Sequence, residues 1–185
     1  NECAKIVIAI SESGHLHKDL IENSKIDIVQ GGRSRAQSVK LCFNHLVGNG
    51  YIEDVLIHDA ARPCLEKSEV KEFLELFSLS KYDGSIFAHH ATDTIKTSID
   101  GKVIDNTVNR SQLWHAETPQ IFNSSKLSKA YHYYKDDICD LTDESSLFDK
   151  TEDKIHLYAH SFNNLKITFK EDLQLAEYLI NNIKD

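Results

Sequence analysis

Short apolar, β-branched segments alternate along this chain with stretches of helical periodicity. The segments lie in the first half, at residues 5–10, 26–29, 54–58 and 84–88. Between them, residues 35–47 and 68–79 carry apolar side chains at spacings of three and four, which is typical of amphipathic helices. This alternation predicts βαβ units, and therefore an α/β domain with a mostly parallel sheet and helices on both faces.

The second half of the chain returns to the same pattern. It predicts helices at 124–135 and 143–150, strands at 154–160 and 164–169, and a final helix from about Lys170. Thr168 and Glu171 are spaced as a capping box for that last helix. A chain of 185 residues without an internal repeat or linker fits one domain, so we expect a single domain over residues 1–185.

Residues 93–108 interrupt the alternation. The stretch DTIKTSIDGKVIDNTV has two extended halves around Asp100-Gly101, a dipeptide that strongly favours a hairpin turn. Neither half is apolar enough for a central strand, so we expect a β-arm at about residues 92–112 that projects from the sheet. An arm with two exposed edges usually needs a partner, which predicts a homodimer.

Charge and hydropathy limit the partners. The formal charge of −8 and the pI of about 5.7 argue against a nucleic-acid surface, which usually has a basic excess. No apolar run approaches the roughly 20 residues that span a bilayer, and no signal peptide is evident, so we expect no membrane partner. A local basic pocket for a phosphorylated small molecule remains compatible with the acidic total.

Neither the cysteines nor the histidines predict a metal site. The cysteines are widely spread and contain no CxxC pair; they are Cys3, Cys42, Cys64 and Cys139. This pattern favours a reducing, cytoplasmic location over a disulfide framework or a zinc site. The pairs His15/His17 and His89/His90 lack the i,i+4 spacing of two ligands on one helix, so we do not expect metal-binding histidines.

A charged cluster follows the strand predicted at 54–58. Ligands of open parallel sheets bind outside the carboxyl ends of the strands, and Asp59 lies at such an end. Ala60 and Ala61 leave room beside it for a bulky ligand, and Pro63 stiffens the turn. The alternative interpretation is a structural turn closed by an Asp59–Arg62 salt bridge.

A second cluster, GGRSRAQSV at residues 31–39, joins a predicted strand to a predicted helix. Gly31 and Gly32 there would offer free backbone amides next to a helix N-terminus, and both features favour anions or the polar edges of a ligand. The pattern is neither a dinucleotide fingerprint nor a P-loop. A Gly-Gly pair is also common in turns without a ligand.

Two further segments carry polar groups in strand-like surroundings. Arg110, Trp114 and Thr118 are spaced by four, so they share one side if their segment is extended. Alternatively, Trp114 packs in the core and Arg110 is solvated. Lys166 lies within an alternating apolar run, so it needs an anion or a carboxylate partner if it is buried, and none if its strand face is exposed.

In their order along the chain, these motifs resemble the 2-C-methyl-D-erythritol 4-phosphate cytidylyltransferases of the non-mevalonate isoprenoid pathway. The motifs, found from about residue 5 to 180, are GGxxRxxSV, VLIHDAARP, DTIK, VNRxxLWxAxTPQ, TDESSL, NxKIT and DLxLAE. The resemblance implies a Rossmann-like nucleotidyltransferase fold with a β-arm that clasps a second subunit. The implied reaction is transfer of a cytidylyl group from CTP to methylerythritol phosphate, with release of pyrophosphate. Ribitol-5-phosphate cytidylyltransferases share most of this scaffold and are the alternative, although HDAARP and DTIK favour the methylerythritol enzyme.

The resemblance also implies how CTP is bound. Gly31, Gly32 and Ser38 resemble residues that contact the cytosine. Asp59 and Ala60 resemble residues that contact the nucleotide near its ribose and phosphates. Asp59 is in addition the candidate ligand for Mg²⁺.

A further set of residues resembles the groups that handle the polyol phosphate. Thr94 and Arg110 resemble residues that grip the sugar phosphate in the neighbouring subunit's site, and Thr118 and Lys166 resemble groups that line that pocket. Arg110 would orient the attacking phosphate through its planar fork, and Lys166 would stabilise the added negative charge, so both are catalytic candidates. Arg62 would support the loop.

One part of the family pattern has no counterpart. The family begins with a strand and a glycine-rich loop, roughly PAAGxGxR, which wraps the triphosphate, and its usual place is upstream of Asn1. Either the sequence is incomplete at this end or the protein is an inactive nucleotide-binding or dimerisation module. A parallel sheet without its first central strand would expose apolar surface and unpaired backbone groups, so we expect an incomplete sequence.

Overall fold

The computed structural model describes residues 3–16, 20, 22–51, 53–134, 138, 140–160 and 164–183. The chain divides into two compact units. One comprises Asn1–Val55 and Phe122–Lys154, and the other comprises Leu56–Ile121 and Ile155–Asp185. No helix in the described part of the chain is long and apolar enough to cross a membrane.

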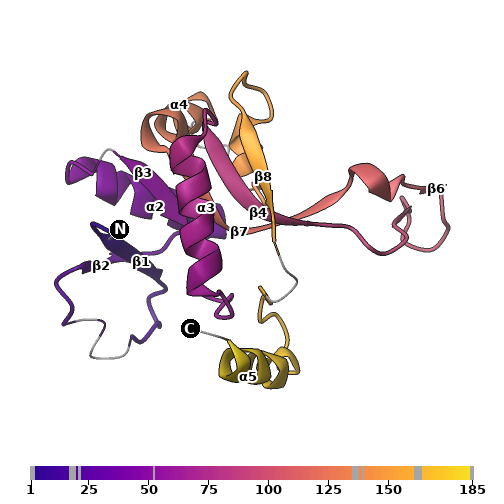
Figure 1. Cartoon of the computed structure of the whole chain (residues 1–185), viewed down its shortest axis with the longest axis horizontal. Coiled ribbons are helices and arrows are strands. Elements are labelled where there is room, and N and C mark those ends of the chain that lie inside the picture. Colours follow the sequence, from indigo (N-terminus) through magenta and orange to yellow (C-terminus); the bar gives the residue numbers. More distant parts are fainter. Residues whose placement is uncertain are drawn as a thin grey trace. The chain divides into compact units, whose positions relative to one another are not determined.

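The first unit is built on two parallel strands. β1 (Ile6–Ile10) pairs with β2 (Ile26–Gln30), and α2 (Arg35–Gly48) packs against both strands (Figure 1). The side chain of Ser34 caps α2 by accepting the N–H of Gln37, because the first backbone amides of a helix have no partner within it. α4 (Ser124–Tyr134) and the 3-10 helix η2 (Ser145–Phe148) complete the unit.

The largest sheet in the described part of the chain has four strands. In spatial order its strands are β3 (Asp54–Ile57), β7 (Trp114–Asn123), β4 (Gly84–His90) and β8 (Ile155–Ala159). β4 and β8 run parallel, with Gly84 opposite Ile155 and Ala88 opposite Ala159. Their carboxyl ends therefore lie at the same edge of the sheet, where His89 and His90 end β4 and His160 follows β8.

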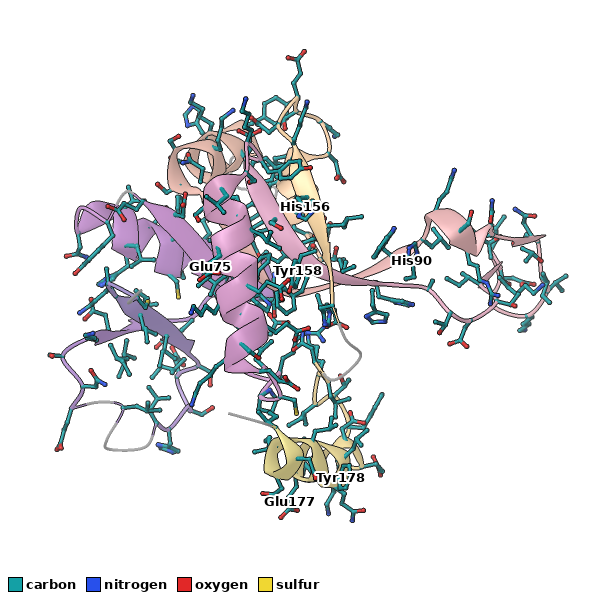
Figure 2. The ribbon with its side chains drawn as sticks, in the orientation of Figure 1. Glu75, His90, His156, Tyr158, Glu177 and Tyr178 are labelled. Atoms are coloured by element: carbon teal, nitrogen blue, oxygen red, sulfur yellow. The ribbon has the colours of Figure 1, made fainter. Side chains whose placement is uncertain are left out.

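Aromatic side chains form the core between this sheet and α3 (Lys67–Leu79). Phe73 of the helix meets Phe87 of β4 edge-on, with ring centroids 4.8 Å apart, and Tyr158 of β8 at 5.2 Å. Tyr158 is labelled on its strand in Figure 2. Because Phe73 and Phe87 are 1% and 0% exposed, their packing fixes the helix on the sheet.

A hairpin lies at the place expected for the arm. β5 (Lys96–Thr97) pairs antiparallel with β6 (Asn106–Thr107), and Figure 1 shows the hairpin standing away from β4 and β7. Asp100 closes the turn by accepting the N–H groups of Lys102 and Val103 at 2.8 and 2.9 Å. The next residue, Gly101, has a φ of +70°, a left-handed conformation that explains the Asp-Gly pair at the tip.

Most elements predicted from periodicity are confirmed to within one or two residues, and β1 and β2, like β4 and β8, are parallel as expected. The strand predicted at 164–169 is wrong, because these residues run without strand pairing; the N–H of Ile167 donates to the carbonyl of Ala61 at 2.8 Å. The helix predicted at 143–150 is reduced to η2. Residue 135 of the predicted helix 124–135, together with His17 and Cys139, lies outside the described residues.

The capping box predicted for the last helix is also wrong. α5 (Asp172–Asn182) begins at Asp172, and the side chain of Glu171 makes no capping hydrogen bond. The carboxylate of Asp172 accepts the N–H groups of Thr168 and Phe169 at 2.8 Å each. One carboxylate thus ties two backbone amides ahead of the helix, and these bonds lower the pKa of Asp172.

Substitution Phe73→Ala tests the aromatic core. Removing this buried ring leaves a cavity beside Phe87 and Tyr158, so the free energy of unfolding should fall by about 3–5 kcal/mol. Phe169→Ala is the matched control, because the Phe169 side chain is 69% exposed and its removal should cost little. Urea titration followed by circular dichroism measures both; equal losses would mean that the ring contacts of Phe73 do not hold α3 on the sheet.

Candidate active site

The turn after β3 places Asp59 at the carboxyl end of that strand. The N–H of Asp59 donates to the hydroxyl Oγ1 of Thr118 at 3.0 Å, and its carbonyl accepts the N–H of Arg62 at 2.9 Å. The chain therefore folds back sharply over Ala60 and Ala61. Ala60 is exposed and carries only a methyl group, so a ligand can approach the backbone there.

Lys166 lies next to this turn. Its ammonium Nζ is 2.8 Å from Oδ2 of Asp59, with 44% of the lysine side chain and 15% of the aspartate side chain exposed. Lys166 is therefore exposed, as in the alternative interpretation, and it also has a carboxylate partner. A half-exposed ion pair of this kind adds little stability, so Lys166 can exchange Asp59 for an anionic ligand at small cost.

Arg62 joins the turn to the segment that carries Lys166. Its guanidinium donates to the carbonyl of Asn164 at 2.7 Å and lies 3.3 Å from Oε2 of Glu117. The amide of Asn164 in turn donates to the carbonyl of Thr118 at 2.7 Å. These bonds hold the chain near Lys166 against the turn without a strand ladder, which is why an extended but unpaired segment can position a lysine here.

Thr118 is buried beneath the Asp59 turn. It is 3% exposed, and its hydroxyl lies 3.1 Å from Nδ1 of His58 as well as accepting the N–H of Asp59. Burial lowers the pKa of His58, against the opposing effect of its contact with the carbonyl of Arg62. The geometry makes Thr118 a support for the turn, while a direct contact with substrate stays a prediction.

The spacing of four between Arg110, Trp114 and Thr118 does not place all three on one strand. Arg110 begins the 3-10 helix η1 (Arg110–Gln112), and β7 begins only at Trp114. Arg110 donates to the carbonyl of Thr92, and Trp114 lies against His90, with ring centroids 3.6 Å apart. Figure 2 labels His90 where the arm leaves the sheet.

Thr94 and Arg110 both lie exposed at the base of the arm. Both belong to the second unit, as do Asp59, Ala60, Thr118 and Lys166, whereas Gly31, Gly32 and Ser38 belong to the first. Within the second unit, Asp59 contacts both Thr118 and Lys166.

The glycine turn of the first unit does not offer free amides, contrary to the prediction. The N–H of Gly31 donates to the carbonyl of Ile10 at 2.8 Å, and that of Gly32 donates to Oγ of Ser38 at 3.1 Å. A Cβ on Gly32 would lie 2.4 Å from Cβ of Gln37, so only glycine fits there. Side chains of the first turn of α2 fold back onto the loop and accept the N–H groups of Gly32 and Arg33, while β1 accepts that of Gly31.

The sequence analysis missed the role of one charged pair. Glu144, of the motif TDESSL, is 1% exposed and accepts two hydrogen bonds from Arg35, the first residue of α2, at 2.9 and 3.0 Å. Both residues belong to the family motifs quoted above, Arg35 to GGxxRxxSV and Glu144 to TDESSL. Their presence in these motifs was the only signal, because the pairing of an arginine with a buried carboxylate is seen only in the structure. Burial beside this pair raises the pKa of Tyr131.

Glu117 is a second residue that the sequence analysis missed. Its pKa is lowered: burial opposes ionisation, but the contact with His160 and the charge of Arg62 outweigh that effect. Its carboxylate also accepts the amide of Asn164 at 2.7 Å. A lone glutamate within a strand gave no signal, because its partners come from four separate segments.

Comparison with known proteins shows similarity over nearly the whole chain. The family model described as IspD, 2-C-methyl-D-erythritol 4-phosphate cytidylyltransferase, matches residues 1–182. A protein of that name from Wigglesworthia glossinidia brevipalpis is 38% identical over 98% of this chain and 78% of its own length. The corresponding protein of Actinobacillus pleuropneumoniae is 42% identical over 95% of this chain and 76% of its own length.

Solved structures show the same relationship. The crystal structure of Francisella tularensis 2-C-methyl-D-erythritol 4-phosphate cytidylyltransferase has a TM-score of 0.82 and 28% identity, covering 95% of this chain and 80% of that one. A structure of the corresponding synthase from Anaerococcus prevotii has a TM-score of 0.79 and 27% identity, covering 97% and 82%. The fold is that of a Rossmann-like nucleotidyltransferase. Within that class, the chain belongs to the 2-C-methyl-D-erythritol 4-phosphate cytidylyltransferase family.

Substitution Thr118→Val tests the support of the Asp59 turn. Valine has nearly the same shape but leaves the N–H of Asp59 without its acceptor, so the free energy of unfolding should fall by about 1–3 kcal/mol. Thr118→Ser keeps the hydroxyl and should retain much of that free energy. Urea titrations of both variants measure the difference; equal stability of the valine and serine forms would show that the hydroxyl does not hold the turn.

Proposed function

We propose that this protein transfers the cytidylyl group of CTP to 2-C-methyl-D-erythritol 4-phosphate in non-mevalonate isoprenoid biosynthesis. A phosphate oxygen of the polyol attacks the α-phosphorus of CTP, the bond from that phosphorus to the β-phosphate oxygen breaks, and pyrophosphate leaves. The observation that carries the proposal is the Asp59–Lys166 pair at the carboxyl end of β3, formed by two family motifs. Such transfers depend on positioning and charge neutralisation, which these residues can supply.

The family resemblance assigns the cytosine contacts to residues of the first unit. Gly31, Gly32 and Ser38 would contact the cytosine, with Gly32 required because a side chain there would collide with Gln37. The amides of the glycine turn are already bonded within the chain, and the Ser38 hydroxyl accepts the N–H of Gly32 and donates to the carbonyl of Ser34, so Ser38 would have to exchange one of these partners to contact a base. In the second unit, the exposed backbone at Ala60 would lie against the ribose.

Asp59 is the candidate ligand for Mg²⁺. A magnesium ion in phosphoryl-transfer sites is usually held by one or two carboxylates together with substrate phosphates, and Asp59 supplies one carboxylate at the strand end where the nucleotide would lie. Bound there, the ion would neutralise charge on the phosphates. The family relationship supports this assignment, and the single partly exposed carboxylate fits it.

Lys166 would act on the reacting phosphates. In the structure its ammonium neutralises Asp59 at 2.8 Å, and 44% of its side chain is accessible to a ligand. A phosphate oxygen arriving beside Asp59 can take the place of the carboxylate as partner of Lys166. The lysine would then stabilise the negative charge that increases on the α-phosphate during attack.

The polyol phosphate would be bound at the base of the arm. Thr94 and Arg110 are exposed there, and the planar guanidinium of Arg110 suits bidentate binding of a phosphate. Thr118 would lie on the inner side of that pocket. Ile99, Val103 and Ile104 on the arm are 96%, 65% and 62% exposed, and these apolar side chains support an arm that clasps a second copy of the chain as a homodimer.

The location proposed for this reaction is the cytoplasm. Cys42 and Cys64 are free, as expected in a reducing compartment. The acidic total charge is consistent with a small-molecule enzyme, and the basic groups that the substrates need are local, at Arg110 and Lys166.

Pyrophosphate release tests the reaction and its substrate together. The product of the intact reading frame is assayed with CTP and Mg²⁺ and with either methylerythritol phosphate or ribitol phosphate. Release with methylerythritol phosphate alone is the expected result. Release with ribitol phosphate alone would keep the mechanism but replace the substrate, and silence with both would overturn the proposed reaction in favour of a nucleotide-binding or dimerisation module.

Substitution Lys166→Ala tests the mechanism. Loss of the ammonium should lower kcat roughly 100-fold or more, because one group that stabilises transition-state charge is typically worth that much. Lys71→Ala on α3 is the control, since the Lys71 side chain is 78% exposed and lies in a surface pair with Glu75. A variant with a normal circular dichroism spectrum and near-normal kcat would remove Lys166 from the mechanism.

A further inference from the structure

Three side chains from neighbouring strands converge on one point of the second unit. His89 lies near the end of β4, Glu117 in β7, and His160 directly after β8. Nδ1 of His89 is 3.0 Å from Oε1 of Glu117, and Nε2 of His160 is 3.1 Å from Oε2 of the same carboxylate. One nitrogen or oxygen from each residue falls within 4.8 Å of the others.

The cluster is partly buried, and Glu117 is the near polar neighbour of the His160 ring. The side chains of His89, Glu117 and His160 are 20%, 10% and 0% exposed. Within the described residues, neither ring nitrogen of His160 has a hydrogen bond of acceptable geometry, so the approach to Glu117 is close but poorly aligned. A polar group in the interior normally has a hydrogen-bond partner. A ring nitrogen that points at a carboxylate without forming a well-aligned hydrogen bond can therefore bind another partner.

We propose that His89, Glu117 and His160 bind a divalent transition-metal ion, with Zn²⁺ the best fit. Two imidazoles and one carboxylate are a donor set that zinc and neighbouring first-row ions take, with a further position left for water. Ligand atoms about 2.0–2.2 Å from such an ion stand roughly 3.0–3.5 Å from one another, so the two nitrogen–oxygen separations already match. A small rotation of the two rings would bring the nitrogens together.

The surroundings of His89 lower its pKa. Burial lowers the pKa of His89, and the nearby His115 and His160 act in the same direction, against the opposing charge of Glu117. A neutral imidazole is the form that binds a metal.

Two other residues surround the carboxylate. Asn164 donates to Oε2 of Glu117 at 2.7 Å, and the guanidinium of Arg62 lies 3.3 Å from the same atom. Hydrogen bonds of this kind orient a metal ligand. The positive charge of Arg62 works against a dication, however, so we expect weaker binding than in a closed structural zinc site.

The position of the cluster gives the ion a function distinct from that of Asp59. It joins the ends of β4, β7 and β8, and the arm with Thr94 and Arg110 leaves the sheet from β4 and returns to it through β7. An ion bound there would cross-link three strands at the base of the arm. The inference uses neither Asp59 nor Lys166 and stands independently of the proposed reaction.

Zinc binding to the purified protein tests the inference. Protein without a histidine tag is stripped with a chelator, and ZnCl₂ is titrated by calorimetry, with the bound metal counted by mass spectrometry under native conditions. We expect one ion per chain, a higher Tm with zinc, and visible absorption bands when Co²⁺ replaces zinc. A folded protein that takes up no zinc, or a zinc-independent Tm, would overturn the proposal.

Matched variants locate the ion. His89→Gln, Glu117→Gln and His160→Gln should each weaken zinc binding at least 10-fold and abolish the cobalt spectrum, whereas His90→Gln, one residue away and exposed, should keep both. Asp59→Asn should also keep zinc binding, which separates this site from the magnesium site. If His160→Gln does not fold, the surface-nearer His89→Gln decides; unchanged affinity in a folded His89→Gln protein would show that the ion binds elsewhere and would refute the assignment.

Discussion

The hydrogen bond from the N–H of Asp59 to the hydroxyl of Thr118 is the interaction on which the candidate active site depends. It fastens the turn after β3 to β7, so the carboxylate of Asp59 stands at the carboxyl end of the sheet. The same hydroxyl, on the buried side chain of Thr118, also lies 3.1 Å from Nδ1 of His58. The turn therefore presents the Asp59 carboxylate beside the exposed Ala60.

Glu117, the residue before Thr118, organises the other side of the same strand. Its carboxylate collects Arg62, Asn164 and two histidines, and Arg62 and Asn164 belong to the two segments that flank the Asp59–Lys166 pair. Two consecutive residues of β7, Glu117 and Thr118, thus hold the two segments that carry Asp59 and Lys166. The ion pair at the surface stays exchangeable because its lysine is half exposed.

Local pattern was a good guide where one face of an element is buried. The helix at 67–79 and the strand at 84–90 follow from apolar periodicity, because Phe73 and Phe87 must face a common core. Pattern misled at 164–169, where alternating apolar residues line an extended segment that has no neighbouring strand to pair with. At the glycine turn, the sequence could not show that Ser38 and Gln37 would fold back and take up the donors.

The sequence by itself determined the α/β class, the family, and the identity of the residues at strand ends, because ordered motifs and apolar periodicity are properties of the chain alone. Only the tertiary structure decided which of these residues meet. Asp59 and Lys166 are separated by more than one hundred positions, and Glu117 gathers its partners from segments that no spacing rule connects. Contacts of this kind depend on the order of the strands and on the need of buried polar groups for partners. Both are determined only when the sheet assembles.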